Sequence, residues 1–275
     1  MYHGRHAAVD LGASTEFFDY RPYTPGDEVS RIDWKHYAKS DRLYVRRHRH
    51  FSDLTVHLVL DASASMDFAS AESDSKAITK YDYARRIAAS LAFLAVRQSD
   101  RVALTIARDT IVAAEPIGGS WPHLRRIVHA LESVGAEGRS DLGEALTLAA
   151  EQVRQRRLVI VLSDFLDDTA SVLDATARLR HAGNDVMAMQ IITRAELDLT
   201  GVGKAELIDR ESGERRRVDA NRARDAYRDR VVRHIERLRS GLVSLGAEHR
   251  VVLTETPPIE ALRDLLRRRS ATSFG

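Results

Sequence analysis

The hydrophobic pattern from Thr55 onward alternates short apolar runs with longer stretches in which apolar residues recur at helical spacing. Such alternation is typical of strands joined by crossover helices in a mostly parallel sheet. Buried central strands are predicted over Thr55–Leu60 and over Leu158–Leu162, of which the second is an unbroken apolar run. The remaining predicted elements are strands over 186–192 and 250–253 and helices over 76–98, 124–131, 142–153, 172–180, 220–245 and from Pro257 onward.

Two interruptions of this alternation predict hairpins. Arg101–Ala107 and Ile111–Ala114 flank a short polar turn, so we expect the second run to form an antiparallel edge strand. Another hairpin is expected as an insertion near 200–218, where polar residues 211–214 separate two extended runs. The predicted fold class is therefore α/β: a doubly wound, mostly parallel sheet with one antiparallel edge strand, spanning 51–275.

Residues 1–50 differ in character from the rest of the chain. They are rich in Arg, His, Tyr, Asp and Gly, they contain a Thr24-Pro25-Gly26-Asp27 turn, and they show no helical stripe. We therefore expect a small N-terminal accessory segment over 1–50, ahead of the α/β domain.

Composition narrows the function classes. The net charge of +2 and the shortness of the basic runs at 46–50 and 267–269 give no reason to expect nucleic acid as a partner. The absence of cysteine excludes disulfides and thiolate metal sites. No apolar run approaches the roughly 20 residues of a membrane span, and the first ten residues lack the apolar core of a signal peptide. We expect a cytoplasmic protein.

The sharpest chemical signal is Asp61-x-Ser63-x-Ser65, which directly follows the first predicted strand. In open α/β sheets, ligands bind beyond the carboxyl ends of the strands. A carboxylate and two hydroxyls on one short loop suit Mg²⁺, which prefers oxygen ligands in octahedral geometry and usually keeps several waters. This loop therefore predicts one part of a metal site.

Two further loops carry the same chemistry. Asp164 follows the strand Leu158–Leu162, and Ser140 comes just before a predicted helix. Each residue taken singly could instead cap a helix or stabilise a turn. Their order and their placement at strand ends favour one shared site for Mg²⁺, with Mn²⁺ or Ca²⁺ as alternatives. The predicted ligands are Asp61, Ser63, Ser65, Ser140 and Asp164.

This ordered set resembles the metal-ion-dependent adhesion site of von Willebrand factor A domains. Serine at 140 stands where threonine is usual, and it keeps the hydroxyl oxygen. The N-terminal segment resembles the bacterial family known as domain of unknown function fifty-eight, and the similarity continues through Ser163-Asp164-Phe165 to the C-terminal helix. The N-terminal residues that carry it are Glu16-Phe17, Arg21-Pro22-Tyr23, Pro25-Gly26-Asp27, Arg31-Ile32-Asp33-Trp34 and Leu43-Tyr44-Val45.

The resemblance implies a von Willebrand factor A-like adaptor that works with a MoxR-type AAA+ ATPase in maturation or assembly of protein complexes. Its metal would bind an acidic side chain of a protein partner, and the chain would not be an enzyme. One alternative is a Mg²⁺-dependent hydrolase or phosphoryl-transfer enzyme that uses Asp61 and Asp164. The sequence supports it poorly, because Gly201–Lys204 lacks the spacing of a phosphate-binding loop and no general base is evident. Another is a scaffold that binds no metal.

Overall fold

The chain forms two compact units in the computed structural model. The first comprises Met1–Asp53 with Gln98–Asp100, and the second comprises Leu54–Arg97 with Arg101–Gly275. The residues that the structure describes are 15–24, 32–34, 36–37, 42–50, 54–70, 78–151, 157–199, 204–208 and 215–264.

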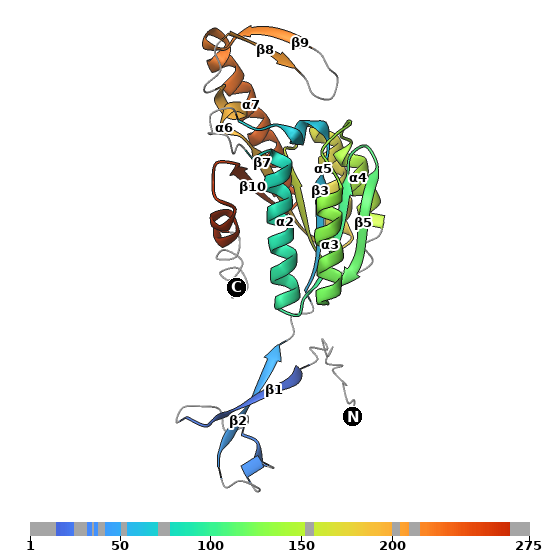
Figure 1. The fold of residues 1–275 in the computed structure, drawn as a ribbon, viewed down its shortest axis with the longest axis vertical. Helices are drawn as coiled ribbons and strands as arrows, with labels where there is room; N and C mark the ends of the chain where they lie inside the picture. The colour runs from blue at the N-terminus through green and yellow to red at the C-terminus, as the bar shows by residue number, and fades with distance from the viewer. Residues whose placement is uncertain are drawn as a thin grey trace, which may run out of the picture. The chain divides into compact units, whose positions relative to one another are not determined.

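The first unit contains the antiparallel strands β1 (Thr15–Pro22) and β2 (Tyr44–His50), drawn in blue in Figure 1. Ile32 forms an isolated bridge to Val45, and both side chains are buried. The sequence predicted no strand in this segment. The long connection between the two strands removes the short turn that ordinarily signals a hairpin.

The second unit is built on a six-stranded sheet with the order β10-β7-β6-β3-β4-β5. Every neighbouring pair is parallel except β4 and β5, which are antiparallel. This confirms the predicted fold class, including the single antiparallel edge strand. The strands are β3 (Thr55–Asp61), β4 (Arg101–Ala107), β5 (Ile111–Gly118), β6 (Leu158–Ser163), β7 (Asp185–Ile192) and β10 (Glu248–Leu253).

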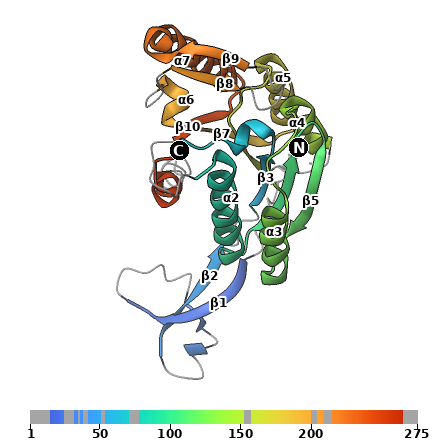
Figure 2. The ribbon, with the colours of Figure 1, turned by 45° about the horizontal axis from the view of Figure 1, so that its top comes forward.

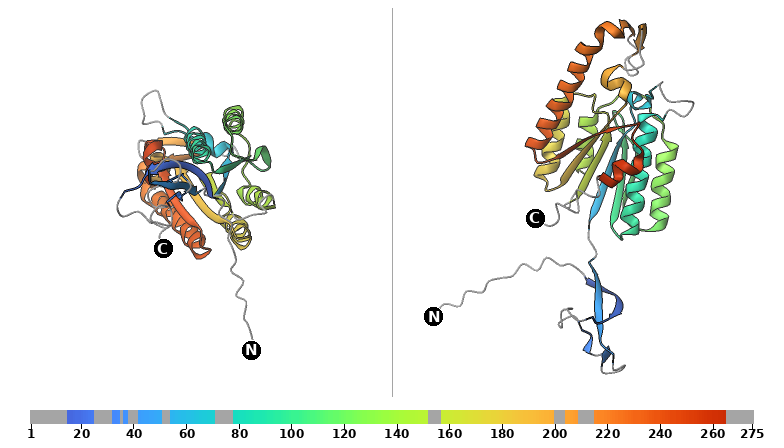
Figure 3. Two further views of the ribbon diagram at one scale, coloured as in Figure 1. Left: turned by 90° about the horizontal axis from the view of Figure 1, so that it is seen from below. Right: turned by 90° about the vertical axis from the view of Figure 1, so that its left-hand side faces the viewer.

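Helices cover both faces of this sheet (Figure 3). On one face, α2 and α3 pack against Leu58 and Leu60 of β3, and on the other face α4, α5 and α7 pack around Val59. Because successive strand side chains point to opposite faces, the fully buried strand β3 contributes to both cores. The helices are α2 (Lys80–Arg97), α3 (Trp121–Ser133), α4 (Leu142–Glu151), α5 (Thr169–His181), α6 (Arg194–Asp198) and α7 (Ala220–Ser244).

A small hairpin lies within the interval where the sequence predicted an insertion. Its strands, β8 (Lys204–Ile208) and β9 (Arg215–Asp219), pair antiparallel next to α7 (Figure 2). Residues 258–264 are helical, as expected after Pro257. No helix in the described ranges is long and apolar enough to cross a membrane.

The start of α4 lies unusually close to α5. A Cβ atom added at Gly143 would lie 1.8 Å from Ser171 Oγ and 3.0 Å from the Ser171 carbonyl carbon. Only glycine fits at this contact without a shift of the neighbouring helix. The contact is relevant to function because the loops that precede α4 and α5 carry Ser140 and Asp164.

We predict that Gly143→Ala lowers the free energy of unfolding by about 1–3 kcal/mol, the usual cost of overpacking. Gly135→Ala is the matched control, because a Cβ there would meet no atom within 4 Å. It should change stability by less than about 0.5 kcal/mol. Urea unfolding followed by circular dichroism measures both, and equal effects of the two substitutions would contradict the close helix contact.

Candidate metal centre

The loop that carries Asp61 and the loop that carries Asp164 meet at the carboxyl ends of β3 and β6. These strands are parallel neighbours with Leu60 opposite Leu162, so Asp61 and Ser163 end them side by side. The Ser163 hydroxyl donates a hydrogen bond of 2.6 Å to Asp61 Oδ2 and accepts one of 2.9 Å from the Phe165 amide. Asp61 and Asp164 are both almost fully buried. The structure thus brings together the two carboxylates that the sequence placed on separate loops.

Backbone and side-chain hydrogen bonds attach the loop of Ser140 to the loops of Asp61 and Asp164. The Ala64 amide donates a hydrogen bond of 2.9 Å to Gly138 O, which joins the loop of Ser140 to the loop of Asp61. The Ser140 hydroxyl donates to Asp167 Oδ2, and the Leu142 amide donates to the same oxygen at 2.9 Å. Asp167 lies three residues after Asp164, so its carboxylate joins the loop of Ser140 to the loop of Asp164.

The serine hydroxyls are not used as helix caps. Ser63 is the residue before the short 3-10 helix Ala64–Asp67, yet its side chain makes no capping hydrogen bond. Its hydroxyl lies 3.1 Å from the Ser65 hydroxyl, while its amide donates to Asp61 Oδ1 at 2.9 Å. At the start of α4 the Glu144 amide is capped by Asp141, the neighbour of Ser140. The capping alternatives therefore do not describe these serines.

A buried lysine that the sequence did not predict joins the site. Lys80 Nζ lies 2.7 Å from Asp164 Oδ2 and 2.5 Å from Glu196 Oε1. The lysine side chain is fully buried. Burial on its own lowers the pKa of Lys80, but the charges of Asp164 and Glu196 outweigh it and raise that pKa above its ordinary value. Lys80 is therefore an ammonium ion inside the protein.

A family model matches most of the chain. Residues 19–237 match the model described as Protein of unknown function DUF58. The chain belongs to this family. It is 30% identical over 259 residues to uncharacterized proteins of Mycobacterium bovis and Mycobacterium tuberculosis, a match that covers 90% of this chain and 80% of each relative.

Solved structures show that this DUF58 chain has a von Willebrand factor A-like fold. BatB from Bacteroides thetaiotaomicron is 16% identical with a TM-score of 0.52, covering 81% of this chain and all of BatB. An aerotolerance-related membrane protein from Bacteroides fragilis is 15% identical with a TM-score of 0.52, covering 78% of this chain and 97% of that chain. At this identity, the likeness concerns the fold alone.

The chemistry of the donor set fits a hard divalent cation. The candidate ligands are all oxygens, two from carboxylates and three from hydroxyls, as Mg²⁺ prefers. No group of three or more His, Asp or Glu side chains that could hold a metal occurs in the described part of the chain. We call the sheet edge where the loops of Asp61, Ser140 and Asp164 meet the rim. A cation bound there would depend on the serine hydroxyls as well as on Asp61 and Asp164.

The charges of the four groups Asp61, Asp164, Glu196 and Lys80 do not balance. Asp61, Asp164 and Glu196 contribute three carboxylates and Lys80 one ammonium, which leaves two negative charges when all four groups are ionised. Burial, followed by the charge of Asp164, raises the pKa of Asp61 to about 7, against the opposing effect of hydrogen bonds from Ser163 and Ser63. A divalent cation has the charge that would neutralise this excess.

The residues that the sequence analysis missed differ in how visible they were. Lys80 lies on the apolar stripe of α2 with Ala84, Ile87 and Leu91, and a lysine on such a stripe is a sign of a buried charge. Glu196 forms a capping box with Thr193, a spacing that sequence alone can reveal. Asp167 had no such signal, because its partners lie on another loop.

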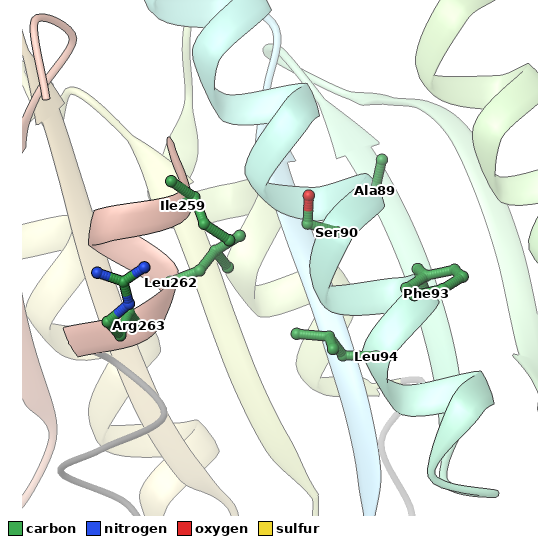
Figure 4. Close-up of a pocket in the computed structure, with 7 residues that line it drawn as sticks. All are labelled: Ala89, Ser90, Phe93, Leu94, Ile259, Leu262 and Arg263. Atoms are coloured by element: carbon green, nitrogen blue, oxygen red, sulfur yellow. The ribbon is translucent and has the colours of Figure 1, made fainter. Parts of the chain in front are cut away.

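An apolar groove elsewhere in the second unit is distinct from this centre. It lies between α2 and the helical residues 258–264, and Figure 4 shows the side chains that line it. Phe93 and Leu94 come from the C-terminal half of α2, whereas Lys80 begins that helix. Among the described residues that line the groove, none carries a carboxylate.

We predict that, in EDTA, the stability advantage of Asp61→Asn over the wild type grows as the pH rises from about 4 to about 7. The Asp61 carboxyl has a folded pKa near 7, above its ordinary value of 3.8, so the folded state holds a proton that the unfolded state has released. Folding therefore becomes less favourable as the pH rises through this window, because the unfolded state is ionised while the folded carboxyl keeps its proton. Asparagine does not titrate.

The two proteins should be compared by urea unfolding at each pH. His57 and His249, whose pKa values burial lowers to about 4, titrate in the same window but contribute equally to both proteins. Parallel stability curves would show that Asp61 does not titrate as the geometry requires.

Proposed function

We propose that this chain is a metal-dependent protein-binding module that acts as an adaptor for a MoxR-type AAA+ ATPase in maturation or assembly of protein complexes. The observation that carries the proposal is the meeting of three loops at one rim, where Asp61 is bonded to Ser163 and the loop of Ser140 is bonded to both others. The ATPase partnership comes from the resemblance of the chain to its family. The metal chemistry comes from the oxygen atoms at the rim.

Asp61, Ser63, Ser65, Ser140 and Asp164 would hold Mg²⁺, with Mn²⁺ or Ca²⁺ as alternatives. When bound, the cation supplies a positive charge and a coordination position that an acidic side chain of a partner can fill. The protein's own groups fix the ligands: Ser163 and the Ser63 amide orient Asp61, and the Leu166 amide donates to Asp164 Oδ1 at 3.2 Å. Ligands held in this way need little rearrangement when a partner docks.

The state of Lys80 removes one candidate general base from the enzyme alternative. A lysine that serves as a general base needs a lowered pKa, because only the neutral amine accepts a proton. The paired carboxylates of Asp164 and Glu196 raise the pKa of Lys80 instead. Hydrolysis or phosphoryl transfer through Asp61 and Asp164 is the competing proposal, and it predicts turnover of a phosphoester.

We predict that titration calorimetry detects Mg²⁺ and Mn²⁺ binding to the wild type and that Asp61→Ala removes it while the protein stays folded. The loss follows because a buried carboxylate ligand disappears from the donor set. Asp174→Ala is the matched control, since Asp174 is an exposed aspartate on α5, and it should bind as the wild type does. Unchanged cation binding by Asp61→Ala would overturn the metal site.

Partner binding is tested with the purified MoxR-type ATPase of the same organism. Its retention by the wild type should require Mg²⁺, should be abolished by EDTA and should fail with Asp61→Ala. Retention that is indifferent to EDTA would indicate a scaffold without metal. Release of phosphate from a model phosphoester that requires Asp61 would instead support the enzyme alternative.

A further inference from the structure

We infer that Lys80 is a positioning residue that shares Asp164 with the bound cation, and that the Lys80–Glu196 pair thereby sets the cation affinity of the site. This inference rests on the proposed function, since it concerns the same rim. It adds two residues, Lys80 and Glu196, that lie outside the adhesion-site motif Asp61-x-Ser63-x-Ser65, Ser140 and Asp164.

The contact between Lys80 and Asp164 is fully internal. Lys80 Nζ is 2.7 Å from Asp164 Oδ2, and the side chains are 0% and 2% exposed. Water cannot screen an interaction at this depth as it does at the surface. The ammonium would therefore repel any cation bound by the same carboxylate, with little screening by water.

Glu196 modifies that effect from a separate element. It belongs to α6, which follows β7, and its Oε1 lies 2.5 Å from Lys80 Nζ. Its other oxygen, Oε2, accepts hydrogen bonds of 3.0 Å from the amide and the hydroxyl of Thr193. These bonds hold the carboxylate in place beside the lysine. Glu196 thus neutralises the ammonium and leaves Asp164 able to attract a second cation.

Lys80 also orients Asp164, together with two groups from other parts of the chain. One carboxylate oxygen accepts from the Leu166 amide and the other from Lys80, while the Asp164 carbonyl accepts from Gln190 Nε2 at 2.9 Å. With both oxygens engaged, the carboxylate has a defined orientation before any metal binds. The lysine therefore acts on the cation through Asp164 and through its charge.

The charge arithmetic makes the two substitutions act in opposite directions. When all four groups are ionised, Glu196→Gln changes their net charge from −2 to −1, so cation binding should weaken by about tenfold or more. Lys80→Met removes the ammonium, so the net charge becomes −3 and cation binding should tighten by about tenfold. A purely structural pair would give no such opposition of sign.

The experiment is Mn²⁺ titration calorimetry on the wild type, Glu196→Gln and Lys80→Met, with the melting temperature of each recorded in EDTA and in Mn²⁺. The matched controls are Glu115→Gln and Arg126→Met, which break an ion pair of 3.1 Å between β5 and α3 and change the protein's total charge by the same amounts. The controls should bind Mn²⁺ as the wild type does. Lys80→Met should melt lower in EDTA and gain more from Mn²⁺ than the wild type.

Weaker binding by Glu196→Gln supports the inference even if Lys80→Met does not fold. Wild-type affinity in Glu196→Gln overturns it and leaves the metal site intact. If no cation binds to the wild type but Mn²⁺ binds to Lys80→Met, the proposed metal dependence fails while the role of Lys80 as the competing cation stands. If none of the three proteins binds Mn²⁺, both proposals fail.

Discussion

The hydrogen bond between Ser163 and Asp61 joins the ends of two neighbouring parallel strands, and the rest of the candidate centre is assembled around that junction. Parallel strands expose their carboxyl ends at one edge, so β3 and β6 bring two loops to the same place. The loop of Ser140 attaches through Gly138 and Asp167, and α6 attaches through Glu196 and Lys80. Five segments far apart in sequence thus converge on one edge of the sheet.

This convergence places an excess of negative charge where little water reaches. Burying carboxylates is costly unless they are paired, and one lysine cannot pair with three of them. Lys80 neutralises part of the excess, and under the proposed function the remainder would favour binding of a cation from solution. Any cation that binds only the folded protein also stabilises it, so cation binding at the rim would raise the free energy of unfolding.

Most of the α/β fold was predictable from hydrophobic periodicity, because buried strands such as β3 and β6 are short, mostly apolar runs and the helices have clear stripes. The antiparallel edge strand was predictable from its short turn, although β5 runs to Gly118 rather than Ala114. The pair β1 and β2 was not, since its strands are joined by a long connection. The α6 helix was also missed, because five residues are too few to show a helical period.

The site was predictable to the extent that its residues follow strands. Asp61 comes directly after an apolar run and Asp164 one residue after another, and the position of a strand end in a parallel sheet fixes which edge it reaches. The partners of those carboxylates could not be derived in the same way. Whether Asp164 faces Lys80, or Ser140 faces Asp167, depends on how helices and loops pack in three dimensions, and no local spacing encodes it.

The most direct measurement is a crystal structure of the protein grown with Mn²⁺ and recorded at a wavelength where manganese scatters anomalously. We predict one anomalous peak at the rim, within coordination distance of the Ser63 and Ser65 hydroxyls and flanked by Asp61 and Asp164, with Lys80 still seated between Asp164 and Glu196. A rim with no anomalous peak at saturating Mn²⁺, in a crystal whose loops are ordered, would contradict the account.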